Sequence, residues 1–127
     1  MPIKKIKTLN APAAIGPYSQ AIQQGNWLFL SGQIPLHPET GEVVGQDISV
    51  QTEQVLKNLM AVLTAAGANL SHVLQTSVYL TDLTDFSQFN QVYSQFFNPP
   101  YPARSTVQVA ALPKGVRIEI AAIAVRE

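Results

Sequence analysis

The chain has 127 residues, of which 46% are hydrophobic and only 13% are charged. This length fits one domain, residues 1–127, and leaves little room for a second core. Eight basic and eight acidic residues balance to a net charge of zero, which argues against nucleic-acid binding driven by phosphates. No cysteine is present, so disulfides, thiolate metal sites and a cysteine nucleophile are excluded.

The same composition indicates how the surface is used. The charged share is about half of the roughly 25% usual for globular domains, and charge depletion is typical of interface cores, so we expect a homo-oligomer. We find no apolar run of about 18 residues and no signal-peptide pattern. We therefore expect a cytoplasmic protein without a membrane partner.

The first half of the chain is predicted to form three strands and a long helix. Residues 2–9, PIKKIKTL, place Ile3, Ile6 and Leu9 among three lysines, which is typical of a protected edge strand. Two β-prone runs flank residues 25–26, GN, and predict a hairpin. Across residues 47–66, apolar positions recur at helical spacing, and Asp47 or Ser49 is placed to cap the helix.

The second half is predicted to form a strand, a helix and two strands. Residues 73–81 alternate and are rich in β-branched side chains. Asp85 with Gln88 resembles a capping box for the second helix, which three prolines then end. The segments 104–112 and 116–125, joined by PKG, predict a final hairpin whose second strand is apolar on both faces and central. The aromatic residues of the second helix share one face: Phe86, Phe89, Tyr93 and Phe96.

The element order β-β-β-α-β-α-β-β predicts an α+β fold. Its natural packing is a mostly antiparallel six-stranded sheet with two helices on one face.

The sequence contains few motifs for known chemistry. His37 and His72 are far apart and have no neighbours at metal-ligand spacing, so we expect no metal site. Ser31, in LSGQ, lacks a nucleophile elbow and a base, and its pattern favours a strand-end serine bonded to backbone.

Two charges stand out against apolar surroundings. Arg104 is the only charged residue between Asp85 and Lys114. Glu119 lies on the final apolar strand, where burial of a carboxylate is costly unless it has a charged or hydrogen-bonding partner or a functional role. A salt bridge between the two is the simplest explanation. The predicted hairpin register, however, separates Arg104 and Glu119 by about 15 Å.

Each charge is therefore expected to find a different partner, in a cleft between subunits. A guanidinium binds a small carboxylate by two parallel hydrogen bonds, and a glutamate can orient and deprotonate a water. This pair favours hydrolysis of a reactive electrophile without a metal or a covalent intermediate.

The sequence resembles the RidA (YjgF/UK) family of reactive-intermediate deaminases over nearly its whole length. The resemblance implies a chorismate-mutase-like fold and a homotrimer with intersubunit sites. It also implies hydrolysis of 2-imino acids and enamines, of the 2-aminoacrylate and 2-aminocrotonate type, to 2-oxo acids and ammonia, without a cofactor. The matching motifs are IGPYSQA at 15–21, LSGQIP at 30–35, QTEQVLKNL at 51–59, VYLTDLTDF at 78–86 and PARSTVQVAALPKGVRIEI at 102–120.

The resemblance also assigns roles to residues. Arg104 would hold the substrate carboxylate, and Glu119 would activate the attacking water. The supporting substrate contacts would be Tyr18, Ser31, Gly32, Asn90 and Thr106. Structural alternatives to these contacts stay open: Tyr18 as a core residue, Gly32 as a backbone requirement and Asn90 as a surface residue.

Thr106 departs from the family pattern, because many relatives have cysteine there. We expect the backbone of this position to make the contact, since threonine is a weak nucleophile without a base. Three other functions compete: a non-catalytic carboxylate-binding or regulatory trimer, an endoribonuclease or translation inhibitor, and a chaperone-like protein. The zero net charge weighs against the ribonuclease.

Overall fold

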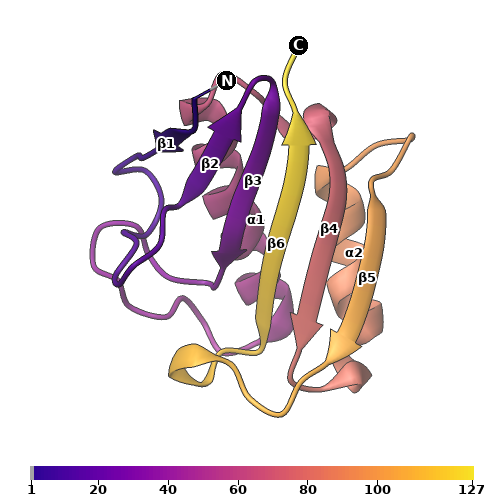
Figure 1. The fold of residues 1–127 in the computed structure, drawn as a ribbon. Coiled ribbons are helices and arrows are strands. Elements are labelled where there is room, and N and C mark those ends of the chain that lie inside the picture. Colours follow the sequence, from indigo (N-terminus) through magenta and orange to yellow (C-terminus); the bar gives the residue numbers. More distant parts are fainter. Residues whose placement is uncertain (1) are drawn as a thin grey trace.

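A computed structural model describes residues 2–127 of the chain. One six-stranded sheet, in the order β1-β2-β3-β6-β4-β5, is covered on one face by two helices (Figure 1). All neighbouring strands are antiparallel except β4 and β5, which are parallel. The predicted α+β fold, the order of its elements and the mostly antiparallel sheet are confirmed.

The elements have the following bounds. The strands are β1 (Lys4–Ile6), β2 (Ala21–Gln24), β3 (Trp27–Gln33), β4 (Val73–Leu80), β5 (Ala103–Gln108) and β6 (Ile118–Val125). The helices are α1 (Ile48–Ala65) and α2 (Phe86–Phe96), with short 3₁₀ turns η1 (Leu70–His72), η2 (Leu83–Asp85) and η3 (Pro113–Gly115).

Helix α1 forms where the sequence predicts it, because its apolar stripe packs against the sheet. Asp47 caps it, accepting hydrogen bonds from the backbone nitrogens of Ser49 at 2.7 Å and Val50 at 3.2 Å. The buried stripe includes Val55, Leu56, Leu59, Val62 and Leu63. Within residues 2–127, no helix is both long and apolar enough to cross a membrane.

Strand β6 lies at the centre of the sheet, as its apolar sequence predicts. Alternate residues from Ile118 to Ala124 are fully buried under the helices. The residues between them, including Glu119 and Ile123, face the other side of the sheet and are only half-buried. This side, called the open face below, carries no helix (Figure 1).

The predicted final hairpin is wrong. Strand β5 pairs in parallel with β4, to which α2 connects it, and β6 lies between β3 and β4. The segment after β5 therefore crosses from the sheet edge to its centre. An apolar strand gains more at the centre, where strands flank it on both sides and the helices bury one of its faces, than at an edge beside its neighbour in sequence.

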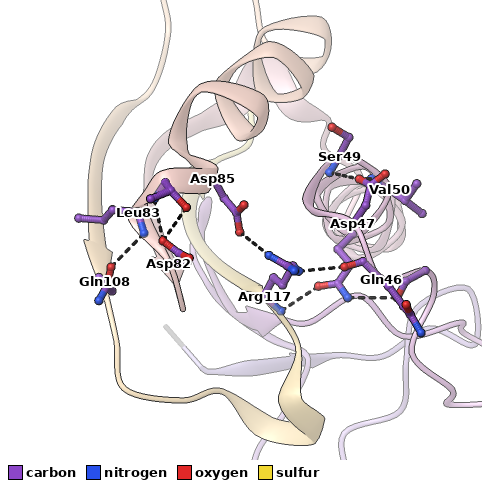
Figure 2. Close-up of polar contacts among 12 residues, drawn as sticks. Gln46, Asp47, Ser49, Val50, Asp82, Leu83, Asp85, Gln108 and Arg117 are labelled. Carbon is purple, nitrogen blue, oxygen red and sulfur yellow. Dashed lines mark hydrogen bonds and ion pairs between the residues drawn. The ribbon is translucent and has the colours of Figure 1, made fainter.

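The predicted capping role of Asp85 is also wrong. Turn η2 precedes α2, and its cap is Asp82, which accepts from the backbone nitrogen of Thr84 at 2.9 Å. Asp85 already has helical backbone angles and makes no side-chain cap. Its carboxylate instead accepts a hydrogen bond from Arg117 at 3.0 Å, and Arg117 Nε donates to the Gln46 carbonyl at 2.9 Å (Figure 2).

Candidate functional site

Four of the predicted site residues line one cleft of about 830 Å³. Its wall comes from β3, β6 and the loops after residues 11, 33 and 112. Ser31 and Gly32 reach it from the end of β3, and Glu119 reaches it from the start of β6. Tyr18, which is 53% exposed, lines the cleft from the first loop.

The carboxylate of Glu119 packs directly against the backbone of Gly32. A Cβ atom at position 32 would overlap Glu119 Oε2 and would lie 2.8 Å from its Cδ. Only glycine leaves room for this carboxylate position. Burial raises the pKa of Glu119 above its ordinary value. A half-buried glutamate of raised pKa is suited to accept a proton.

Two further contacts hold the walls of this cleft. Ser31 Oγ donates to the Ser19 carbonyl at 2.6 Å, so its hydroxyl joins β3 to the first loop, as the strand-end alternative predicts. Lys114, at φ 58°, donates from Nζ to the Gly41 carbonyl at 3.0 Å and links two loops that line the cleft.

Arg104 lies elsewhere, on the edge strand β5, and faces the helix layer. Its Cζ is 5.6 Å from the ring centroid of Phe86, 5.1 Å from that of Phe89 and 4.9 Å from that of Tyr93. Among residues 2–127, no carboxylate lies within ion-pair distance of it. The guanidinium is thus held by aromatic faces, and a carboxylate is the partner it lacks.

Asn90 lies on α2 and Thr106 on β5, the two elements that surround the Arg104 side chain. Asn90 follows Phe86 by one helical turn, and its side chain is half-buried. Thr106 follows Arg104 by two residues on β5, so both side chains face the same side. Its Oγ1 atom is buried and makes no hydrogen bond within the described chain.

The two groups lie on opposite faces of the sheet. Arg104 pairs with Thr76 of β4, and Glu119 pairs with Tyr79, three residues further along the same strand. An odd offset reverses the side-chain direction, and two strand spacings plus three residues give a separation of about 14 Å. The predicted absence of an intrachain salt bridge is confirmed, although the hairpin register that motivated it is wrong.

Sequence reasoning missed the aromatic residues around Arg104. Phe86, Phe89 and Tyr93 were expected to share a helix face, but that face was not connected with Arg104. The sequence feature that could have predicted this contact was a lone arginine shortly after a helix rich in aromatic residues. No cluster of three or more His, Asp or Glu side chains suited to a metal ion occurs in the described part of the chain.

Comparison with known proteins identifies the fold family. A sequence profile described as Endoribonuclease L-PSP matches residues 8–126. A RutC family protein from Pyrococcus horikoshii is 55% identical over 122 residues, which cover 96% of this chain and 97% of the relative. This chain belongs to that family, the RidA/YjgF family.

Other members match the chain over nearly their full length. The Escherichia coli 2-iminobutanoate/2-iminopropanoate deaminase is 51% identical over 126 residues, covering 97% of this chain and 98% of the enzyme. The solved structure of the E. coli YjgF gene product superposes with a TM-score of 0.93 at 50% identity, covering 98% and 99% of the two chains. The RidA-like, chorismate-mutase-like fold expected from the sequence is confirmed.

Proposed function

We propose that this protein hydrolyses reactive 2-imino acids and their enamine tautomers, of the 2-aminoacrylate and 2-aminocrotonate type, to 2-oxo acids and ammonia. The observation that carries the proposal is the Glu119 carboxylate held against Gly32 in a cleft, together with Arg104, which has no carboxylate partner among residues 2–127. The deaminase name of the E. coli relative agrees with it.

The chemistry needs two groups. Arg104 binds the substrate carboxylate through two parallel hydrogen bonds and orients the imine. Glu119 takes a proton from water as the water oxygen attacks the carbon of the protonated imine, and a neutral tetrahedral amino alcohol results. Glu119 then returns this proton to nitrogen. The C–N bond breaks as the carbonyl forms, and the hydroxyl proton passes through Glu119 to ammonia, which leaves as ammonium. Tyr18, Ser31, Gly32, Asn90 and Thr106 would contact the substrate.

The site would be completed by a second copy of the chain. Within one chain, Arg104 and Glu119 are about 14 Å apart on opposite sheet faces, too far for a substrate of three or four carbon atoms. A homotrimer with three intersubunit sites, as the family resemblance implies, would bring the Arg104 edge of one chain to the Glu119 cleft of the next.

The test couples this protein to a serine dehydratase that releases 2-aminoacrylate, and follows loss of the imine. The wild-type protein should accelerate this loss, and Arg104→Ala and Glu119→Gln should each lower the rate by about 100-fold or more. Lys57→Met, at an exposed position of α1 that lines neither the Glu119 cleft nor the rings beside Arg104, is the control and should keep full activity. A rate unchanged by wild-type protein would refute the deaminase.

Ribonuclease activity is the second candidate, because the matching family carries that description. The zero net charge disfavours RNA binding. Labelled RNA incubated with wild-type and Glu119→Gln protein should remain intact in both. Cleavage that Glu119→Gln abolishes would favour the ribonuclease over the deaminase.

A further inference from the structure

The guanidinium of Arg104 sits beside three aromatic rings that all come from α2. Phe86, Phe89 and Tyr93 recur at intervals of three and four residues, so they form one ridge on the helix. Each ring centroid is within 5.6 Å of the Arg104 Cζ atom. A cation at this distance from a ring face is attracted by the ring quadrupole.

Two of the three rings are rigidly placed. Phe89 is fully buried and Tyr93 is 5% exposed, and their centroids are 5.3 Å apart. The Tyr93 hydroxyl shares a hydrogen bond of 2.8 Å with Thr76 Oγ1. Thr76 is also the β4 partner of Arg104 in the sheet register. The helix ridge, strand β4 and the edge strand β5 are thereby held together around the guanidinium.

The third ring is the accessible one. Phe86 is 37% exposed and packs on Phe89 at 6.3 Å between centroids. Ring faces attract the plane of the guanidinium and leave N–H donors at its edge for a carboxylate. A flexible arginine without this support would lose more side-chain entropy when it binds a ligand.

We propose that Phe86, Phe89 and Tyr93 form an aromatic cradle that pre-organises Arg104 for a ligand carboxylate, and that these three rings are positioning residues. The inference rests on the proposed function only in that Arg104 binds a carboxylate. The cradle acts on the binding of that carboxylate and leaves the proton transfers at Glu119 unchanged. Its loss therefore raises KM and Kd more than it lowers kcat.

The first test replaces Phe86 by leucine, a change at a partly exposed position that the fold tolerates. Binding of 2-oxobutyrate, a stable 2-oxo acid, is measured by calorimetry. Phe86→Leu should raise its Kd about threefold to tenfold and leave kcat within about twofold. Phe96→Leu is the matched control, since Phe96 is a partly buried ring on α2 that is not one of the three rings facing Arg104, and it should leave Kd unchanged.

The second test separates ring electrostatics from packing. Mono-, di- and trifluorinated phenylalanine at position 86 keep the ring shape while they weaken its quadrupole. A stepwise rise in the Kd for 2-oxobutyrate along this series supports the cradle. A constant Kd along the series, or equal losses in Phe86→Leu and Phe96→Leu, would overturn it.

The outcomes distinguish this inference from the proposed function. If the wild-type protein binds 2-oxobutyrate with the expected fluorine dependence but does not deaminate, the cradle stands and the deaminase fails. If it deaminates with no dependence on the ring at position 86, the deaminase stands and the cradle fails. Absence of 2-oxobutyrate binding by wild-type protein would overturn the cradle and the Arg104 role together.

Discussion

At the residue scale, the contact between Gly32 and Glu119 defines the geometry of the candidate base. Gly32→Ala places a methyl group where the carboxylate now lies. Because the carboxylate ends a flexible side chain, it can rotate away, and stability should change by less than about 1 kcal/mol. Deamination should fall about tenfold or more, since small displacements of a catalytic group are costly.

The control for this change is the double variant. Gly32→Ala with Glu119→Gln should be no less active than Glu119→Gln alone, because the methyl group acts only through the carboxylate. Additive losses of activity in the double variant would show that Gly32 serves some other purpose. Deamination rates and urea unfolding of the four proteins give the comparison.

The raised pKa of Glu119 makes a prediction about pH. Burial lets the folded chain bind this proton more tightly than the unfolded chain does. Stability linked to Glu119 is therefore lost as pH rises from the ordinary glutamate pKa through the raised pKa of the folded state. Glu119→Gln should melt at a higher temperature than wild type above this window, and the difference should vanish below it.

Activity should change with pH in the opposite direction to this stability contribution, because both depend on the protonation of Glu119. The base works only when ionised, so kcat/KM should rise through the raised pKa of Glu119. Thermal melting and rate measurements across acid to neutral pH check both statements. Melting curves of wild type and Glu119→Gln that shift in parallel with pH would contradict the assignment.

At the element scale, Arg117 anchors the start of β6 to two other segments. Its backbone nitrogen donates to Gln51 Oε1 at 2.8 Å, and its guanidinium bonds to Gln46 and to the Asp85 carboxylate (Figure 2). Asp85 is 14% exposed in its side chain, so losing its partner is costly. Arg117→Met should lower the unfolding free energy by about 1–2 kcal/mol.

The matched control is a more exposed ion pair on α1. Lys57 contacts Glu53 at 3.1 Å with both side chains more than half exposed. Lys57→Met should cost at most about 0.5 kcal/mol. Urea unfolding of the two variants measures the difference, and equal losses would refute the anchoring role of Arg117. Arg117→Lys should lie between Arg117→Met and wild type, because lysine keeps the charge but not the planar donors.

At the scale of the whole molecule, the open face of the sheet is the surface that another copy would cover. Trp27 and Phe29 stack there at 6.4 Å between centroids and are 49% and 47% exposed. Their β6 partners Val125 and Ile123 extend the apolar area. We predict a trimer mass by native mass spectrometry and light scattering.

A charge in this surface should disrupt the trimer. Phe29→Lys should yield monomer and lower deamination at least tenfold, since each site would lack half of its residues. Met60→Lys, on the exposed side of α1 in the helix layer, should keep the trimer. A wild-type monomer, or an active Phe29→Lys monomer, would contradict the intersubunit site.

Local patterns were sufficient for most elements of the fold. The helical period of α1, its Asp47 cap, the hairpin of β2 and β3 and the apolar character of β6 all follow from neighbours in the sequence. The same reasoning singled out Arg104 and Glu119, because burying a charge in an apolar segment is costly without a partner or a functional role. Each of these features depends on side chains within a few residues of one another.

Strand pairing could not be read in this way. The choice of β3 and β4 as neighbours of β6, and of β4 as the parallel partner of β5, depends on which arrangement buries the most apolar surface across the whole sheet. That choice put Arg104 among the rings of α2 and Glu119 against Gly32, on opposite faces. The residue types in the sequence indicated the chemistry by themselves. Where those residues lie depends on which apolar surfaces the whole chain buries. Only the tertiary structure therefore decided that Arg104 and Glu119 lie in two separate places of one chain.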